Sequence, residues 1–119
     1  MPENCCEPRS LKWYPLSAWR GGSQAIRIGS YWLWVDHRPI TGFDGSRNLY
    51  IHRFTLGDED LTRIIATSPP FVFRNYSIEF CAGLAIDGDK LVLSYSMRDA
   101  FPFLAIVDAE AVIKTLECV

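Results

Sequence analysis

The sequence lacks several features that would point to common classes of function. It has no apolar run of roughly eighteen residues, so we predict no membrane-spanning helix. It has no excess of positive charge: the net charge is −2, which argues against a nucleic-acid partner because a basic face would be expected there. The N-terminus is acidic and lacks an apolar segment, so it does not predict a secretory signal, and we expect a cytoplasmic protein.

The spacing of the cysteines and histidines argues against a metal or redox protein. The chain has four cysteines and two histidines. No two cysteines form a Cys-x-x-Cys pair, and His37 and His52 complete no zinc-ligand spacing. We therefore expect no metal and no resident cofactor, and free thiols rather than a disulfide framework.

What the sequence does contain is β-strand pattern. Residues 49–56 alternate strictly, with Tyr50, His52 and Phe54 on one face. Asp87-Gly88 separates two apolar runs and is the strongest short-range hairpin signal, because the turn needs φ > 0 and glycine supplies it without steric cost. Further strands are predicted at residues 24–28, 31–35, 61–66, 71–73 and 101–107.

The last segment changes its period. Asp108 suits an N-cap, and Val112, Ile113 and Leu116 follow at helical spacing, which predicts a short helix over residues 108–116. A helix of this length needs a sheet face to dock against.

The chain of 119 residues fits one domain, and its first 19 residues show no clear period. Ser68-Pro69-Pro70 divides the strands into two groups. Two groups of short strands predict an all-β fold, either a sandwich or two adjacent blades of a β-propeller. The pattern alone does not separate these two architectures.

Several short motifs occur in an order that resembles a known family. They are Arg20-Gly21-Gly22-Ser23-Gln24, Trp34-Val35-Asp36-His37, Tyr50-Ile51-His52-Arg53-Phe54, Ile78 to Leu84, Leu93 to Asp99, and Ile106-Val107-Asp108. Together, over about residues 20–117, they resemble the C-terminal part of the five-bladed β-propeller proteins related to β-mannoside phosphorylases and hydrolases, the glycoside hydrolase family 130-like group.

The resemblance implies a fold as well as a chemistry. Residues 20–117 would form two antiparallel four-stranded blades of a partial β-propeller with a short C-terminal helix, after a poorly specified leader at residues 1–19. Because the family's ring has about five blades, we expect a fragment. Two blades leave a sheet face and strand edges uncovered, so we expect self-association or a partner that supplies the missing blades.

The family cleaves a β-mannosidic bond with inversion, while inorganic phosphate or water attacks. Its general acid comes from an earlier blade and has no counterpart here, so no catalytic residue is assigned. We expect a carbohydrate or glycoside ligand, inorganic phosphate as a possible co-substrate, and incomplete catalytic machinery. The alternative is a non-catalytic β-sheet module for interaction or assembly.

Three polar residues near the first motifs are candidate substrate contacts. Arg20 and Gln24 flank the turn into an inner strand, and inner strands line a propeller's funnel; Arg would donate to phosphate or sugar oxygens. His37 stands where the related phosphorylases place a phosphate-contacting histidine. The structural alternatives are a solvated Arg20 and a His37 bonded to a backbone carbonyl.

Two acidic residues complete the set of candidates. Glu79 lies inside an apolar run, where a carboxylate is costly to bury; it would accept from a sugar hydroxyl, or pair with Arg74 or Arg98. Asp99 resembles a family residue that contacts sugar hydroxyls, and its alternative is a turn residue bonded to its own backbone. His52 is expected to be packed and hydrogen-bonded.

Overall fold

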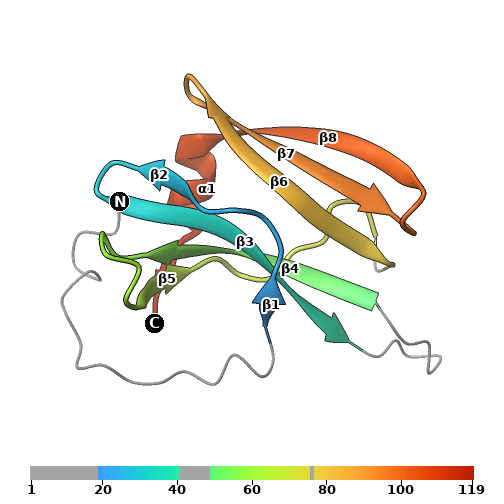
Figure 1. Cartoon of the computed structure of the whole chain (residues 1–119), viewed down its shortest axis with the longest axis horizontal. Helices are drawn as coiled ribbons and strands as arrows, with labels where there is room; N and C mark the ends of the chain where they lie inside the picture. The colour runs from blue at the N-terminus through green and yellow to red at the C-terminus, as the bar shows by residue number, and fades with distance from the viewer. Residues whose placement is uncertain (1–18, 41–48, 76) are drawn as a thin grey trace.

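The structure is a computed structural model that describes residues 19–40, 49–75 and 77–119. The described residues form mostly antiparallel strands, with one short helix among them (Figure 1). The elements are β1 (Arg20–Gly21), β2 (Ile26–Ile28), β3 (Tyr31–Ile40), β4 (Leu49–Gly57), β5 (Ile64–Thr67), β6 (Glu79–Asp87), β7 (Lys90–Met97), β8 (Phe101–Asp108), α1 (Ala109–Thr115) and β9 (Glu117–Cys118). The predicted all-β class and the short C-terminal helix are therefore confirmed.

The strands form two sheets whose sizes differ from the prediction. The larger sheet has six strands in the order β1-β3-β4-β5-β9, with β2 also paired to β3, and the smaller has three in the order β6-β7-β8. The predicted grouping of four and four strands is wrong. The difference arises because β1 and β2 both pair with β3, and because β9, only two residues long, returns to pair with β5. A two-residue strand carries no period that a sequence pattern could reveal.

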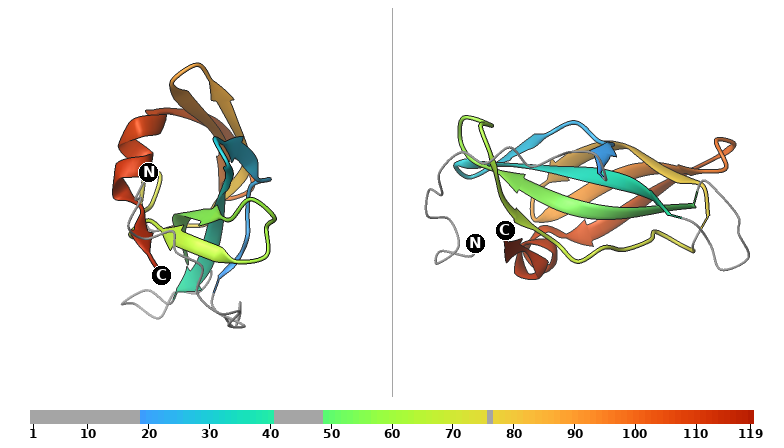
Figure 2. Two further views of the ribbon diagram at one scale, coloured as in Figure 1. Left: turned by 90° about the vertical axis from the view of Figure 1, so that its left-hand side faces the viewer. Right: turned by 90° about the horizontal axis from the view of Figure 1, so that it is seen from below.

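One hydrophobic core lies between the two sheets. Leu33, Val35 and Leu56 contribute to it from the larger sheet, and Leu84 and Leu93 from the smaller one. All five side chains are buried, and burying each stabilises the fold by about 2 kcal/mol. Figure 2 shows the smaller sheet lying across the larger one, with α1 at one side of both.

The C-terminal segment joins the two sheets. It leaves β8, forms α1, whose Val112 is buried in the core, and ends in β9 at the edge of the larger sheet. Asp108 stands at the predicted N-cap position, but its side chain makes no cap hydrogen bond and instead pairs with Lys90. Packing of the apolar face, rather than a cap, thus holds this seven-residue helix.

The predicted hairpin is confirmed, with its loop one residue later than expected. Asp87 pairs with Lys90, so the loop is Gly88-Asp89. Gly88 has φ 61 and Asp89 has no positive φ, the pattern of a turn that needs glycine at its first position. The next connection, from β7 to β8, holds Arg98 and Asp99 at positive φ instead.

The thiols differ from expectation at one position. Cys81 is buried and free, and burial raises the pKa of its thiol to about 11. Cys118 is disulfide-bonded, so the prediction of a free thiol is wrong there. Linear spacing does not show which distant cysteines meet. Cys5, Cys6 and the rest of the leader up to residue 18 lie outside the described residues.

Within the described part of the chain, no helix has the length and apolar character needed to cross a membrane. The cytoplasmic location stays a prediction.

Candidate functional site

The strand pair β3–β4 carries polar groups on both of its faces at one end. Directly opposite residues in an antiparallel pair share a face. His37 opposes His52 on the face turned toward the smaller sheet, continuing the apolar pair of Val35 and Phe54. The other face carries a second polar group, built around Asp36.

The two histidines lie among aromatic rings between the sheets. His52 is 0% exposed, and His37 is also buried. The ring of His37 makes edge contacts with Tyr50 at 5.1 Å and Phe80 at 5.3 Å between centroids. The ring of His52 lies 4.8 Å from that of Phe73. The pair is thus held rigidly from both sheets.

Both histidines are neutral at pH 7. Burial lowers the pKa of His52 to about 4, with a smaller contribution from His37. Burial also lowers the pKa of His37, followed by the charge of Arg20; the Asp36 carboxylate and a hydrogen bond with the Gly21 backbone act in the opposite direction. A neutral imidazole offers one donor and one acceptor.

Several ring nitrogens of this pair have no hydrogen-bond partner. Among the described residues, Nδ1 of His37 and both ring nitrogens of His52 are buried and unpaired. The Nε2 of His52 lies 3.9 Å from Oε1 of Glu79, too far for a hydrogen bond. Each buried unpaired group costs about 1–3 kcal/mol. Buried unpaired groups are uncommon in folded proteins, and a bound water, an ion or a ligand can satisfy them.

Glu79 at the start of β6 is 0% exposed and is satisfied by backbone groups. Its carboxylate accepts hydrogen bonds from the backbone N–H groups of Phe73 and Arg74, each at 2.9 Å, and from that of Asn75 at 3.5 Å. These partners explain how an apolar run tolerates a carboxylate. They differ from both predicted alternatives, a sugar hydroxyl and the side chain of Arg74 or Arg98.

The structure brings some of the candidate residues together and leaves others apart. Arg20 in β1 is exposed and pairs across the strands with His37, and Glu79 lies beside His52. Gln24 lies elsewhere: its side-chain Nε2 donates to the carbonyl of Leu84 at 2.6 Å, and its Oε1 accepts from the N–H of Leu84. It thereby takes the place of a strand partner for β6.

Asp99 lies in the exposed turn between β7 and β8, with φ 55. Because Glu79 pairs with Met97, this turn lies at the end of the smaller sheet where Glu79 begins β6. Asp99 is thus at the same end of the molecule as His37 and His52, but no contact joins it to either histidine.

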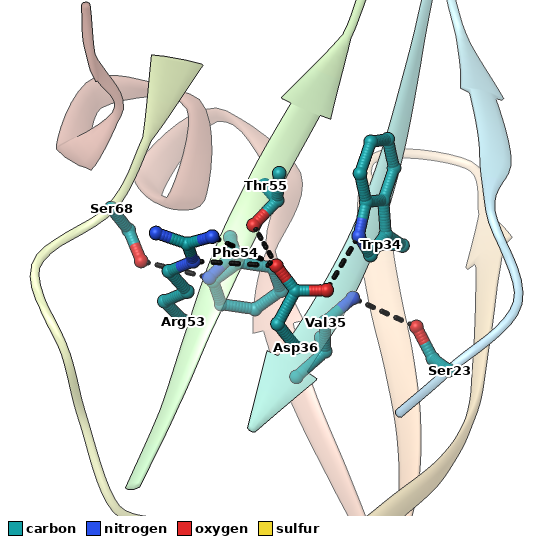
Figure 3. Close-up of polar contacts among 8 residues, drawn as sticks. All are labelled: Ser23, Trp34, Val35, Asp36, Arg53, Phe54, Thr55 and Ser68. Carbon is teal, nitrogen blue, oxygen red and sulfur yellow. Dashed lines mark hydrogen bonds and ion pairs between the residues drawn. The ribbon is translucent and has the colours of Figure 1, made fainter. Parts of the chain in front are cut away.

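Sequence reasoning missed the polar network on the opposite face (Figure 3). The buried Asp36 accepts from Nε1 of Trp34 at 2.6 Å and from Oγ1 of Thr55 at 2.7 Å. Arg53 pairs with the same carboxylate at 3.3 Å and lies under the ring of Trp19, 4.3 Å from its centroid. The carboxylate is fully partnered, so this network fixes β3 against β4 from behind the histidines.

Two serines satisfy the backbone where neighbouring strands are interrupted. The N–H of Val35 donates to Oγ of Ser23, and the N–H of Phe54 donates to Oγ of Ser68, each at 2.9 Å (Figure 3). Val35 and Phe54 are themselves paired. The register that brings His37 opposite His52 is therefore held from both edges of the strand pair.

His52 was expected to be packed and hydrogen-bonded. The predicted packing is confirmed. The predicted hydrogen bonding of the side chain is wrong, because neither ring nitrogen has a partner among the described residues. The available signal was its position on the same face as Phe54, which marks it as inward-facing. The register that brings it opposite His37 depends on the connection over residues 41–48, a polar, Gly-containing stretch whose sequence does not fix which residues of the two strands pair.

The described residues contain no group of three or more His, Cys, Asp or Glu side chains placed to hold a metal ion. Comparisons of the chain with family models, with curated proteins and with solved structures found no match. Functional inference therefore rests on the residues and their geometry.

The buried His52 predicts a loss of stability in mild acid. Its pKa is about 4 in the folded chain and about 6.5 when unfolded, so the unfolded chain binds more protons between these values. The free energy of unfolding should fall by roughly 3 kcal/mol as pH drops from 6.5 to 4. Urea unfolding across this range should show a shallower fall in His52→Gln than in the native chain. Equal pH dependence in the two proteins would contradict the burial of a neutral histidine.

Proposed function

We propose that this chain is a carbohydrate-binding β-sheet unit, related to the sugar-cleaving five-bladed propellers that its motifs resemble, with Arg20 and His37 meeting the ligand. The observation that carries this proposal is the exposed Arg20 paired across from His37, one of two buried histidines whose ring nitrogens include several without a partner among the described residues. A guanidinium supplies donors for sugar or phosphate oxygens, and Nδ1 of His37, which has no partner among the described residues, can make one hydrogen bond to a hydroxyl.

The sheet arrangement supports a propeller-derived unit. Strands β2, β3, β4 and β5 form a four-stranded antiparallel meander in chain order, with β9 added at its edge. Strands β6, β7 and β8 form a second meander that packs on the first over one core. Neighbouring propeller blades pack face to face, as do the two sheets of a β-sandwich.

Binding rather than catalysis is proposed. Inverting cleavage requires an acid and a base on opposite sides of the scissile bond. Glu79 is buried under backbone N–H groups, and Asp36 is tied to Trp34 and Thr55. Neither carboxylate is free to donate a proton to a ligand at the Arg20 edge.

Calorimetric titration with methyl β-mannoside, β-mannobiose and inorganic phosphate tests the proposal. Arg20→Gln should weaken binding of at least one of these ligands about tenfold, because a charged hydrogen bond contributes roughly 1.5–3 kcal/mol. Arg27→Gln is the matched control, since Arg27 is an arginine of β2 that pairs with Glu59. Equal binding by the two variants, or no binding by the native chain, would refute the site.

A second function, β-sheet assembly, is favoured by the outer face of the smaller sheet. Leu104 and Ile106 of β8 are 69% and 68% exposed. Beside them, a groove of about 360 Å³ runs over the small side chains of Ser94 and Ser96. A two-fold partner would place the Leu104 ridge of each copy in the groove of the other, so we propose a second copy of this chain as the occupant.

Light scattering coupled to size exclusion tests this association. The native chain should elute as a dimer, and Leu104→Lys should give a folded monomer because a buried unpaired charge opposes the contact. Lys114→Glu in α1, on an exposed helix face, is the control and should stay dimeric. A native monomer would contradict self-association. If the native chain does not bind itself but binds a different β-sheet protein through this face, the partner is that protein and not a second copy.

A further inference from the structure

A second groove lies at the end of the smaller sheet where Glu79 begins β6. It has a volume of about 440 Å³. Its lining combines apolar rings with polar groups: Asn75, Ser77, Met97, Arg98, Phe101 and Phe103. This mixture of an apolar floor and a few polar groups is typical of small-molecule sites.

The groove is rigidly connected to the histidine pair by a column of aromatic rings. His52 contacts Phe73 at 4.8 Å, Phe73 stacks on Tyr95 at 4.3 Å, and Tyr95 stacks on Phe103 at 5.5 Å between centroids. Phe103, the last ring, forms one wall of the groove. The guanidinium of Arg74 lies 4.8 Å from the centroid of the Phe103 ring. The wall is therefore fixed rather than adaptable.

The polar rim of the groove is also fixed. Glu79 accepts from the backbone of Arg74 and Asn75, and the N–H of Arg98 donates to the carbonyl of Ile78 at 2.7 Å. The hydroxyl of Ser77 is buried without a hydrogen-bond partner among the described residues. An unpaired hydroxyl in the lining is a group that a ligand can satisfy.

The charges around the groove favour an anion. Arg98 lines it, and Arg74 lies against its wall. No carboxylate is part of the described lining; Asp99 adjoins Arg98 in the turn but does not line the groove. The Glu79 carboxylate is fully buried. The ring of Phe101, whose residue is 59% exposed, offers a flat apolar surface at the mouth.

We propose that this groove binds a sugar that carries a negative charge, a phosphate or a carboxylate, with Arg98 and the Ser77 hydroxyl holding the anionic group and Phe101 packing on the sugar ring. Guanidinium groups bind both kinds of anion through paired hydrogen bonds. The assignment of a sugar rests on the carbohydrate function proposed above. The groove is lined by residues other than Arg20 and His37, so an experiment can refute one of the two proposed sites without refuting the other.

Calorimetric titration with glucose 6-phosphate, glucuronate, methyl glucoside and inorganic phosphate tests the proposal. At least one charged sugar should bind at least about tenfold more tightly than methyl glucoside and than inorganic phosphate. Comparison of the two charged sugars distinguishes a phosphate from a carboxylate. Arg98→Gln should weaken the charged sugar about tenfold, whereas Arg27→Gln should leave it unchanged.

Two further variants measure what the Phe101 ring and the Ser77 hydroxyl contribute to binding, apart from the charge of Arg98. Phe101→Ala should weaken the charged sugar more than it weakens inorganic phosphate. Ser77→Ala should weaken binding without lowering the unfolding temperature, because it removes a hydroxyl that has no partner among the described residues. This last result distinguishes a binding role from a structural one.

Several results would overturn the proposal: equal affinity for charged and neutral sugars, inorganic phosphate binding as tightly as the sugar phosphate, or identical behaviour of Arg98→Gln and Arg27→Gln. Suppose that the charged sugar needs Arg98 to bind, while mannosides do not bind or bind equally well to Arg20→Gln. That result would support the groove and refute the site at Arg20. If mannosides need Arg20 to bind and no charged sugar binds, the site at Arg20 would be supported and the groove refuted.

Discussion

The buried carboxylate of Glu79 is the interaction on which the functional end of this molecule depends. It holds the segment that connects the two sheets by accepting the backbone N–H groups of Phe73 and Arg74. That segment supplies the ring that packs on His52 and the side chains that frame the second groove. A carboxylate buried at this depth is tolerated only with such donors, so its burial and the position of the connecting segment are determined together.

The strand pair β3–β4 separates two kinds of polar group. On its outer face, Asp36 is satisfied by Trp34, Thr55 and Arg53, and this network fixes the strands against each other. On its inner face, His37 and His52 are buried and neutral, with ring nitrogens that lack partners among the described residues. The satisfied group stabilises the scaffold, and the unsatisfied one has hydrogen-bonding capacity to offer a ligand. The inner face with the two histidines is therefore the face that we propose meets a ligand.

Local sequence patterns predicted most of the longer strands, because period-two alternation and hairpin turns act over a few residues. The strand around His52 and the turn at Gly88 are examples. The predicted strand at residues 71–73 is wrong, since Phe71 makes only an isolated bridge with His52. The partners of Glu79 were not predictable, since they are backbone groups of a connection without secondary structure, and no side-chain pattern reports them. The position of His37 opposite His52 depends on register across residues 41–48, and the pairing of β9 with β5 depends on where α1 docks. Arg20 and His37 were found as candidates from a motif, whereas the groove beside Arg98 follows only from packing.

Amide hydrogen exchange at Phe73 and Arg74, followed by NMR, tests the role of Glu79 most directly. In the native chain both amides should exchange slowly, although they lie outside any strand or helix. In Glu79→Gln at least one should exchange about tenfold faster, because an amide side chain has a single acceptor oxygen, and amides of β3 and β4 should stay protected. Glu110→Gln, at an exposed position, should change neither amide. Rapid exchange of both amides in the native chain, or unchanged exchange in Glu79→Gln, would contradict the account.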